Sequence, residues 1–321
     1  MKTWKLLLGI GGTLALGSAA AMIWTYEKAF RPQNAREKIP ENLPDLRQVD
    51  DYRDEIFHNM ETFQAHACEE VFIQSQDGLR LHGRFYMGEA GAPLVIAFHG
   101  FRSSSLRDLS GGMEFYRSHG LSLLLVDQRA CGESEGRAIT FGIKERYDCL
   151  AWALYADERL GGKTPIFLSG ISMGAATVLM ASDLDLPASV KGIIADCPYT
   201  SPEDILVKAG GEMHFPTLPA RLLLRSSARV LGGFGLNESS AEKAVANTKV
   251  PLLILHGEDD DFVPTAMGEA IAKTAKEGMA EFYTFPGAAH EFSYLSDKER
   301  YQRLVCDFIL KNSGYDLLKK A

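Results

Sequence analysis

Residues 166–177 read IFLSGISMGAAT, and this stretch decides the fold. A short apolar run ends at Gly170 and an alanine-rich segment follows from Met173, which predicts a strand, a sharp turn and a helix. The turn fits the pattern G-x-S-x-G, in which flanking glycines let the backbones approach closely and the turn lifts the Ser172 hydroxyl above the sheet. The helix that follows directs its dipole and its free N–H groups at the place beside Ser172 where an oxyanion would develop. Ser172 is therefore a candidate nucleophile, and an ordinary turn serine is the alternative.

Apolar runs on both sides of this turn predict an eight-stranded sheet. Most of them are continuous rather than alternating, as in strands that helices cover on both faces. Asp77-Gly78 is typical of a hairpin turn between the first two runs. Helical segments separate the later runs, which indicates an α/β fold with a mostly parallel sheet. The expected strands are Val71–Gln74, Leu79–Met87, Leu94–His99, Leu121–Asp127, Ile166–Gly170, Val190–Asp196, Leu252–His256 and Glu281–Phe285.

One connection is much longer than a crossover between parallel strands needs. More than 50 residues separate Asp196 from Leu252, whereas a plain crossover takes roughly a dozen. Residues 200–248 therefore predict a small helical cap, and its leucine-rich part is expected to face the active-site cleft. Packing of this apolar part against the sheet is the alternative. The other expected helices are Glu55–Ala67, Ile143–Leu160, Met173–Leu184, Ala266–Lys276 and Asp297–Asn312.

Length, charge and cysteine content exclude several classes of protein. The 321 residues allow one large domain, and the net charge of −8 gives no general attraction for phosphate backbones, so nucleic acid is not expected as a partner. The five cysteines form no C-x-x-C pair, which argues against a disulfide framework and a structural zinc site. We expect neither a metal nor an organic cofactor, and the sequence gives no oligomeric state.

The first 26 residues are expected to be a membrane anchor. Leu6–Trp24 carries no charge and, as a helix, is about long enough to cross the hydrocarbon core of a bilayer. A cleaved signal peptide is the alternative, because Lys2 and Lys5 precede the run and Ala19-Ala20-Ala21 resembles a cleavage site. We expect a single-pass anchor in the cell membrane, a catalytic domain over residues 67–321, and a linker with one short helix over residues 27–66. The signal-like N-terminus favours an extracytoplasmic domain, whereas the lysines and arginines that follow the run do not favour this orientation, so both orientations stay open.

A serine nucleophile needs a base, and the base needs an acid. Three histidines follow Ser172: His214 in the expected cap, His256 at the end of a strand, and His290 in a small-residue loop after the last strand. The position of His290 favours it as the base, and His256 is expected to make a structural contact. Asp259–Asp261 follow a buried strand, and their pattern does not show which one reaches the histidine.

Taken together, these motifs resemble the α/β-hydrolase superfamily over about residues 70–312. The resemblance rests on His99-Gly100-Phe101, the Asp127–Ser134 loop, Gly170–Gly174, the His256–Pro264 segment and His290. The pattern H-G-x-x-D-x-x-V-P in His256–Pro264 selects Asp260 as the acid. Ala130 departs from the usual loop, where glycine is common. Arg129 in this loop is expected to brace it rather than to bind an anionic substrate.

The resemblance implies a serine hydrolase of the membrane-associated bacterial type, near the esterase and serine aminopeptidase branches. Ser172, Asp260 and His290 would form a catalytic triad that cleaves a small acyl-ester or lipid-like substrate through an acyl-enzyme. The backbone N–H groups of Phe101 and Met173 would form the oxyanion hole. A peptidase with the same triad and a non-catalytic binding protein of this fold are the alternatives.

Overall fold

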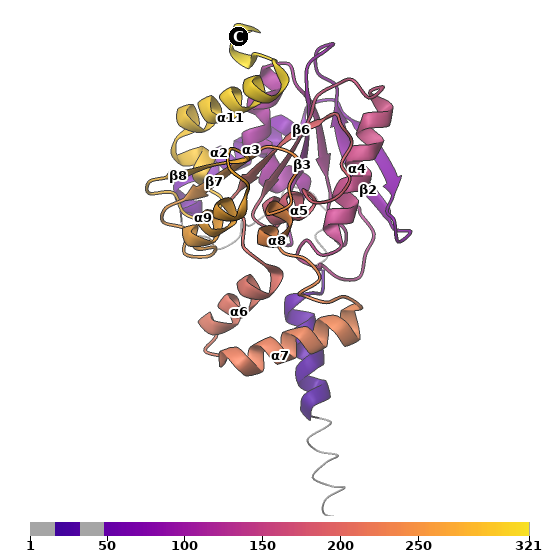
Figure 1. The fold of residues 1–321 in the computed structure, drawn as a ribbon, viewed down its shortest axis with the longest axis vertical. Coiled ribbons are helices and arrows are strands. Elements are labelled where there is room, and N and C mark those ends of the chain that lie inside the picture. Colours follow the sequence, from indigo (N-terminus) through magenta and orange to yellow (C-terminus); the bar gives the residue numbers. More distant parts are fainter. Residues whose placement is uncertain (1–16, 33–47, 321) are drawn as a thin grey trace, which may run out of the picture.

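The computed structural model describes residues 17–32 and 48–320 (Figure 1). All eight expected strands are present, and they form one sheet in the order β1-β2-β4-β3-β5-β6-β7-β8. The pairs β1–β2 and β2–β4 are antiparallel, and the other pairs are parallel, which confirms the mostly parallel sheet. The strands are β1 (Glu69–Gln74), β2 (Arg80–Tyr86), β3 (Leu94–Phe98), β4 (Ser122–Val126), β5 (Ile166–Ile171), β6 (Val190–Asp196), β7 (Leu252–Gly257) and β8 (Ala280–Phe285).

Helices cover both faces of the sheet because successive side chains of each central strand point to opposite faces. Leu94 and Ile96 of β3 pack into one hydrophobic cluster, and Val95 and Ala97 pack into the other. The first cluster is completed by α4 (Glu145–Arg159), α5 (Met173–Met180), α8 (Ala241–Val245) and α9 (Thr265–Thr274). The second is completed by α2 (Val49–Gln64), α3 (Ser105–Ser118), α11 (Lys298–Ser313) and the short 3₁₀ helix η2 (Leu317–Lys320), while the four-residue α10 (Ser293–Ser296) lies between β8 and α11.

The inserted segment forms a cap, but a shorter one than residues 200–248. α6 (Pro202–Glu212), α7 (Thr217–Ser227) and the π-helix η1 (Ala228–Gly232) stand away from the sheet at one end of the molecule (Figure 1). The Glu203 carboxylate ties α6 to α7 through ion pairs with Arg221 and Arg225 at 3.0 and 2.8 Å. Helix α8, by contrast, buries Ala241 and Val245 in the sheet cluster, so the chain has returned to the core before Thr248.

The residues expected to begin a linker are instead packed against the domain. Residues 17–29 are helical, and Phe30 after them is fully buried, with ring centroids 6.1 Å from Phe141 and 5.3 Å from Phe234. The Arg102 guanidinium donates hydrogen bonds to the carbonyl oxygens of Lys28 and Arg31 at 2.7 and 3.0 Å. Helix α2 begins at Val49, earlier than the expected Glu55, and residues 33–47 lie outside the described residues.

Most of the expected membrane anchor also lies outside the described residues, because residues 1–16 belong to that part. Within residues 17–32 and 48–320, no helix combines the length and the apolar character that crossing a bilayer requires.

The turn between β5 and α5 depends on two glycines. A β-carbon at Gly170 would lie 2.3 Å from the carbonyl carbon of Gly174, and one at Gly174 would lie 2.0 Å from the carbonyl oxygen of Phe98 in β3. Between them Ser172 adopts φ 53° and ψ −114°, a conformation that non-glycine residues rarely take. The glycines of the G-x-S-x-G pattern are therefore required because three backbone segments approach closely at this turn.

We predict that Gly174→Ala destabilises the protein, because the added methyl group collides with the backbone of a central strand. Overpacking of this kind costs about 3 kcal/mol, which lowers Tm by roughly 6–12 °C in a domain of this size. Gly112→Ala in α3 is the control, since its methyl group meets nothing within 4 Å and alanine favours a helix. Thermal unfolding checks the pair, and equal Tm values for the two variants would contradict this account of the turn.

Candidate active site

Ser172 lies at the N-terminus of α5, almost completely buried beneath the cap. Its N–H donates a hydrogen bond to the Asp196 carbonyl oxygen at 2.9 Å, which joins the turn to the end of β6. Its hydroxyl oxygen is 2.9 Å from Nε2 of His290. The first requirement for an activated serine, a base within hydrogen-bond reach, is met in the structure.

His290 comes from the loop after β8 and bridges two other loops. Its Nδ1 atom is 2.7 Å from Oδ2 of Asp260, opposite the contact between Nε2 and Ser172. A β-carbon at Gly257 would lie 2.3 Å from the carbonyl oxygen of Ala288, so the ends of β7 and β8 must approach closely to hold this arrangement. The structure thus brings together three residues that are up to 118 positions apart in the sequence.

Among the three adjacent aspartates, the structure distinguishes Asp260. Its Oδ1 atom accepts hydrogen bonds from the N–H groups of Phe262 and Val263 at 3.0 and 2.7 Å, so the carboxylate is fixed. Asp259 and Asp261 are exposed. The Nε2 atom of His256 is 2.8 Å from the Val263 carbonyl oxygen and 3.3 Å from Oδ2 of Asp260, so this histidine supports the acid's loop.

The electrostatics of the pair favour a charged acid and a protonatable base. Burial alone would raise the pKa of Asp260, but hydrogen bonds with His256 and His290 together lower it to about 2. Burial would lower the pKa of His290, but the hydrogen bond to Asp260 and the negative charges of Glu291, Asp260 and Asp196 together raise it. The imidazolium form is therefore stabilised in place.

The loop after β3 passes directly over Ser172. A β-carbon at Gly100 would lie 3.6 Å from Cβ of the serine, so a backbone without a side chain runs alongside the hydroxyl. Phe101 follows, and its ring stacks on Phe141 at 4.9 Å. Met173 is the first residue of α5, a position whose N–H has no partner within the helix. The two predicted oxyanion donors therefore belong to the segments on either side of the Ser172 side chain.

An apolar cavity of about 210 Å³ opens next to Ser172. It lies beneath α6 and α7, and the helix of residues 17–29 contributes Trp24 and Thr25 to its wall. Leu223 and Leu224 of α7 line it, whereas Leu218, Leu222, Val230 and Leu231 are exposed. The expectation that the leucine-rich part of the cap faces the cleft is therefore right for one side of α7 and wrong for the other.

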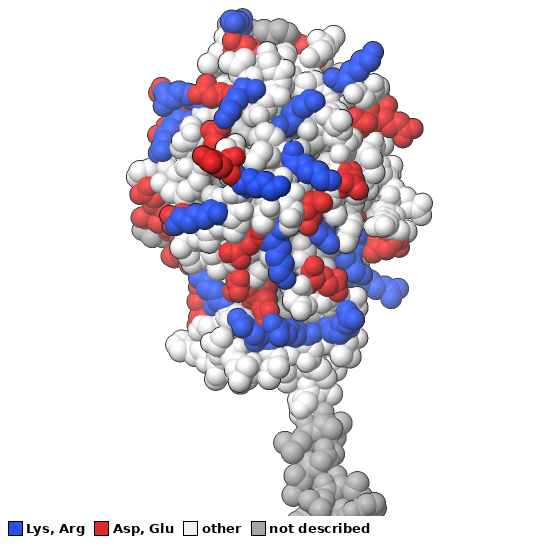
Figure 2. Space-filling model, in the orientation of Figure 1, with Lys and Arg blue, Asp and Glu red and all other residues white. Residues whose placement is uncertain are grey.

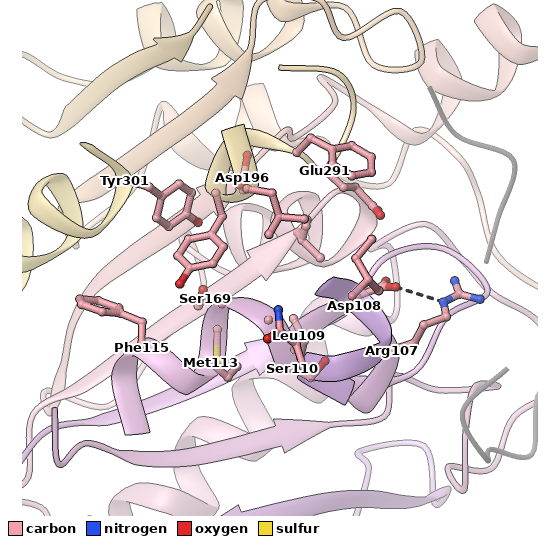
Figure 3. A pocket seen from close by; sticks show the side chains of 18 of the residues that line it. Arg107, Asp108, Leu109, Ser110, Met113, Phe115, Ser169, Asp196, Glu291 and Tyr301 are labelled. Atoms are coloured by element: carbon pink, nitrogen blue, oxygen red, sulfur yellow. Dashed lines mark hydrogen bonds and ion pairs between the residues drawn. The ribbon is translucent and has the colours of Figure 1, made fainter. Parts of the chain in front are cut away.

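Two carboxylates near the serine were missed by the sequence analysis. A β-carbon at Gly100 would lie 2.7 Å from Oε1 of Glu291 and 3.0 Å from Oδ2 of Asp108. Both residues line a second cavity of about 130 Å³ on the α3 side of β5, where Asp108 is paired with Arg107 at 3.2 Å (Figure 3). Burial and the nearby Asp108 raise the pKa of Glu291 to about 7. The one sequence signal was the position of Glu291 directly after His290.

Arg129 braces its loop, as expected. Its guanidinium binds the carboxylates of Asp148 at 2.6 Å and Asp77 at 2.9 Å. Ala130, which replaces the more usual glycine, adopts φ 63°, so the turn keeps a left-handed conformation at this position. Within residues 17–32 and 48–320, this loop makes no hydrogen bond to Ser172, whose side chain contacts His290.

One group of side chains has the spacing of a possible metal site. It consists of Cys197, Asp260 and His290, whose candidate ligand atoms lie within 4.8 Å of one another. The donor chemistry does not suit a cation. Burial raises the pKa of the Cys197 thiol well above its usual range, which keeps it protonated, and the thiolate is the form that binds metals. Asp260 and His290 are already engaged with each other.

Comparisons with known proteins agree with this fold. Residues 94–304 match the alpha/beta hydrolase family. The chain is 23% identical over 306 residues to the uncharacterized protein YqkD of Bacillus subtilis, covering 95% of this chain and 97% of that protein. It is 24% identical over 237 residues to the lysophosphatidylserine lipase ABHD12 of Danio rerio, covering 69% and 59% of the two chains. The structure of the Pyrococcus furiosus esterase Pf2001 superposes with a TM-score of 0.62 at 22% identity, over 85% of this chain and 99% of that one. The chain belongs to the alpha/beta hydrolase family.

Proposed function

We propose that this hydrolase cleaves carboxylic esters through an acyl-enzyme formed on Ser172. The observation that carries the proposal is the continuous line of hydrogen-bonding groups from the Ser172 hydroxyl through His290 to Asp260, at 2.9 and 2.7 Å. These distances lie within the reach that proton transfer requires. No step of this chemistry requires a metal or an organic cofactor.

In the proposed mechanism, the Ser172 hydroxyl attacks the ester carbonyl while Nε2 of His290 takes its proton. Asp260 holds the other ring nitrogen and stabilises the imidazolium. The N–H groups of Phe101 and Met173 stabilise the tetrahedral oxyanion, and His290 then gives its proton to the departing alcohol. A water molecule, deprotonated by the same histidine, then attacks the acyl-enzyme. The bond between the acyl carbon and Oγ of Ser172 breaks, His290 returns the proton to Oγ, and the carboxylic acid product leaves.

The proposed substrate is an ester with an apolar acyl group, such as a lipid-like molecule. The cavity beside Ser172 is lined mainly by apolar side chains of the cap and of the helix over residues 17–29. Apolar cavities with a few convergent polar groups are typical small-molecule sites. The names of two similar proteins, an esterase and a lysophosphatidylserine lipase, favour the same class of substrate.

We further propose that residues 1–26 hold the enzyme at the cell membrane with its catalytic domain on the extracytoplasmic side. The uncharged run Leu6–Trp24 supports the anchor, and the lysines that precede this run resemble those of export signals.

A peptidase remains the second candidate, and one observation favours it. A substrate with a free amine needs a carboxylate near the nucleophile, and Glu291 and Asp108 both lie next to Gly100, beside Ser172. Hydrolysis of aminoacyl nitroanilides in preference to nitrophenyl esters would decide for the peptidase.

The test of the function is a series of nitrophenyl esters of increasing chain length, with the wild-type chain and Ser172→Ala. We expect Ser172→Ala to lose turnover, leaving only the residual rate that binding and the oxyanion hole provide. Turnover of the variant at the wild-type rate would remove Ser172 as the nucleophile.

The same series tests the acyl cavity. Leu223→Trp fills the cavity and is expected to shift the preference toward shorter chains, because Leu223 lines it. Leu222→Trp is the matched control, since this neighbouring side chain is exposed and does not line the cavity. An unchanged chain-length preference in Leu223→Trp would place the acyl group elsewhere.

We predict that Asp260→Asn lowers kcat far more than Asp259→Asn or Asp261→Asn. The amide can hold the wrong tautomer of His290, and a loss of about 10⁴ is known for a comparable triad. The two neighbouring aspartates are exposed and serve as matched controls. Similar losses in all three variants would contradict the assignment of the acid.

We predict that kcat/KM for a soluble ester falls with decreasing pH through a value above the ordinary histidine pKa of about 6.5. The base acts in its neutral form, and the raised pKa of His290 means that this form is lost at a higher pH than usual. Glu291, whose own pKa is about 7, stabilises the imidazolium only in its ionised form. Glu291→Gln removes this charge on the alkaline side of the range, so the fall should move to lower pH. Glu258→Gln, on an exposed side chain, is the control. A movement to higher pH in Glu291→Gln would contradict this electrostatic account.

A further inference from the structure

One end of the molecule carries an unusual concentration of exposed apolar side chains. Of the fourteen large apolar side chains exposed among the described residues, eight lie on the N-terminal helix or between residues 213 and 231. We call this surface the apolar end. It consists of Ile23, Trp24, Met213, Phe215, Leu218, Leu222, Val230 and Leu231.

The apolar end is bordered by positive charge, although the whole chain is acidic. Residues 217–232 contain three arginines and no acidic residue, in a chain whose net charge is −8. Arg221 and Arg225 share the single carboxylate of Glu203, which leaves one positive charge in excess, while Arg229, with 72% of its side chain exposed, pairs with Glu238 at 3.4 Å. Figure 2 shows a row of Lys and Arg side chains above an uncharged tip at the end where α7 lies.

Some residues of the apolar end also line the apolar cavity next to Ser172, which we call the catalytic cavity. Trp24 and Phe215 have ring centroids 5.8 Å apart and close the gap between the N-terminal helix and the cap. Together with Met213 they also line the cavity that reaches Ser172. An apolar molecule that enters at this end therefore meets apolar walls up to the serine.

We propose that the apolar end docks on a lipid bilayer, so that the catalytic cavity opens toward the membrane and takes its ester from the lipid phase. This proposal rests on the proposed function, since it names the source of the substrate of Ser172. A bilayer is the occupant that fits because the uncharged run Leu6–Trp24 ends within the apolar end. Amphipathic helices with arginines beside an apolar face bind at the boundary between lipid headgroups and acyl chains, and anionic lipid strengthens this binding.

Docking is distinct from tethering by the first residues alone. If the chain were only tethered, residues 213–231 would face water, and their exposed apolar side chains would play no part. If the apolar end docks, Leu218 and Val230, each 68% exposed, are covered by lipid. The environment of position 218 in the membrane-bound full chain therefore decides between the two arrangements.

A fluorescent label measures this environment directly and needs no catalytic turnover. We would attach the environment-sensitive dye NBD to Leu218→Cys in the full-length chain carrying Cys68→Ser, since Cys68 is the exposed cysteine and the other four are buried. The chain is then placed in vesicles of phosphatidylcholine and phosphatidylglycerol. We expect a blue shift and quenching by lipids with spin labels in their acyl chains. Leu154→Cys on α4, half-exposed and far from the apolar end in sequence, is the control and should show neither change.

Two outcomes would overturn the proposal. Equal spectra for positions 218 and 154 in vesicles would show that the domain is tethered without docking. A blue shift at position 218 that depends on protein concentration and is insensitive to the lipid quenchers would show that a second copy of the chain covers the surface instead.

Turnover provides the functional arm of the test. Leu218→Glu combined with Leu222→Glu should lower hydrolysis of an ester embedded in vesicles by roughly tenfold, because two charges weaken the apolar contact with lipid. Hydrolysis of a water-soluble short-chain ester should not change, since neither leucine lines the catalytic cavity. Leu154→Glu combined with Leu310→Glu is the matched control, with both leucines exposed elsewhere. Equal loss on both substrates would contradict docking. Absence of any ester hydrolysis in the wild-type chain would contradict the proposed function, and the fluorescence of the label at position 218 would then test docking alone.

Discussion

Gly174 lies so close to the carbonyl oxygen of Phe98 that no side chain fits between them, and the rest of the active site depends on this contact. The contact lets α5 begin directly after β5, so that Ser172 sits in a strained turn at the helix N-terminus. From there the hydroxyl faces the loops that follow β3, β7 and β8. These loops follow the carboxyl ends of parallel strands of the sheet, where α/β folds bind their ligands. A looser turn would move the Ser172 hydroxyl away from Nε2 of His290.

The charges around Ser172 are arranged so that a protonated His290 is balanced by the negative charge of Asp260. Two backbone N–H groups hold one oxygen of Asp260, and its hydrogen bonds with His256 and His290 keep the carboxylate charged inside the protein. Glu291 and Asp196 add negative charge near the same ring and raise its pKa further. The proposed mechanism thus depends on preorganised dipoles and charges.

The sequence predicted the fold and the candidate triad because both are carried by local patterns. The continuous apolar runs of β3 and β4 and the spacing of G-x-S-x-G are visible in the printed residues, and H-G-x-x-D-x-x-V-P singled out Asp260. Helix α3 was missed because Gly111 and Gly112 interrupt its helical pattern, and packing of Leu109 and Met113 on the sheet outweighs that weakness. The carboxylate of Asp108 was missed for the same reason, because it lies on α3.

The orientation of α7 could not be predicted from the sequence. Leucines on both of its sides give no signal for which side faces the cavity. Phe30 looked like part of a linker because its partners Phe141 and Phe234 are more than 100 positions away.

The central claim is that Ser172 forms a covalent intermediate with the substrate's acyl group, and a fluorophosphonate tests it most directly. This reagent phosphonylates a serine that a neighbouring base has activated: the serine oxygen bonds to phosphorus and fluoride leaves. The adduct is stable enough for mass spectrometry of the digested chain. The account predicts one modified peptide, with the added mass on Ser172, and loss of that modification in His290→Ala. An adduct on another residue, or an unmodified chain that still hydrolyses esters, would contradict it.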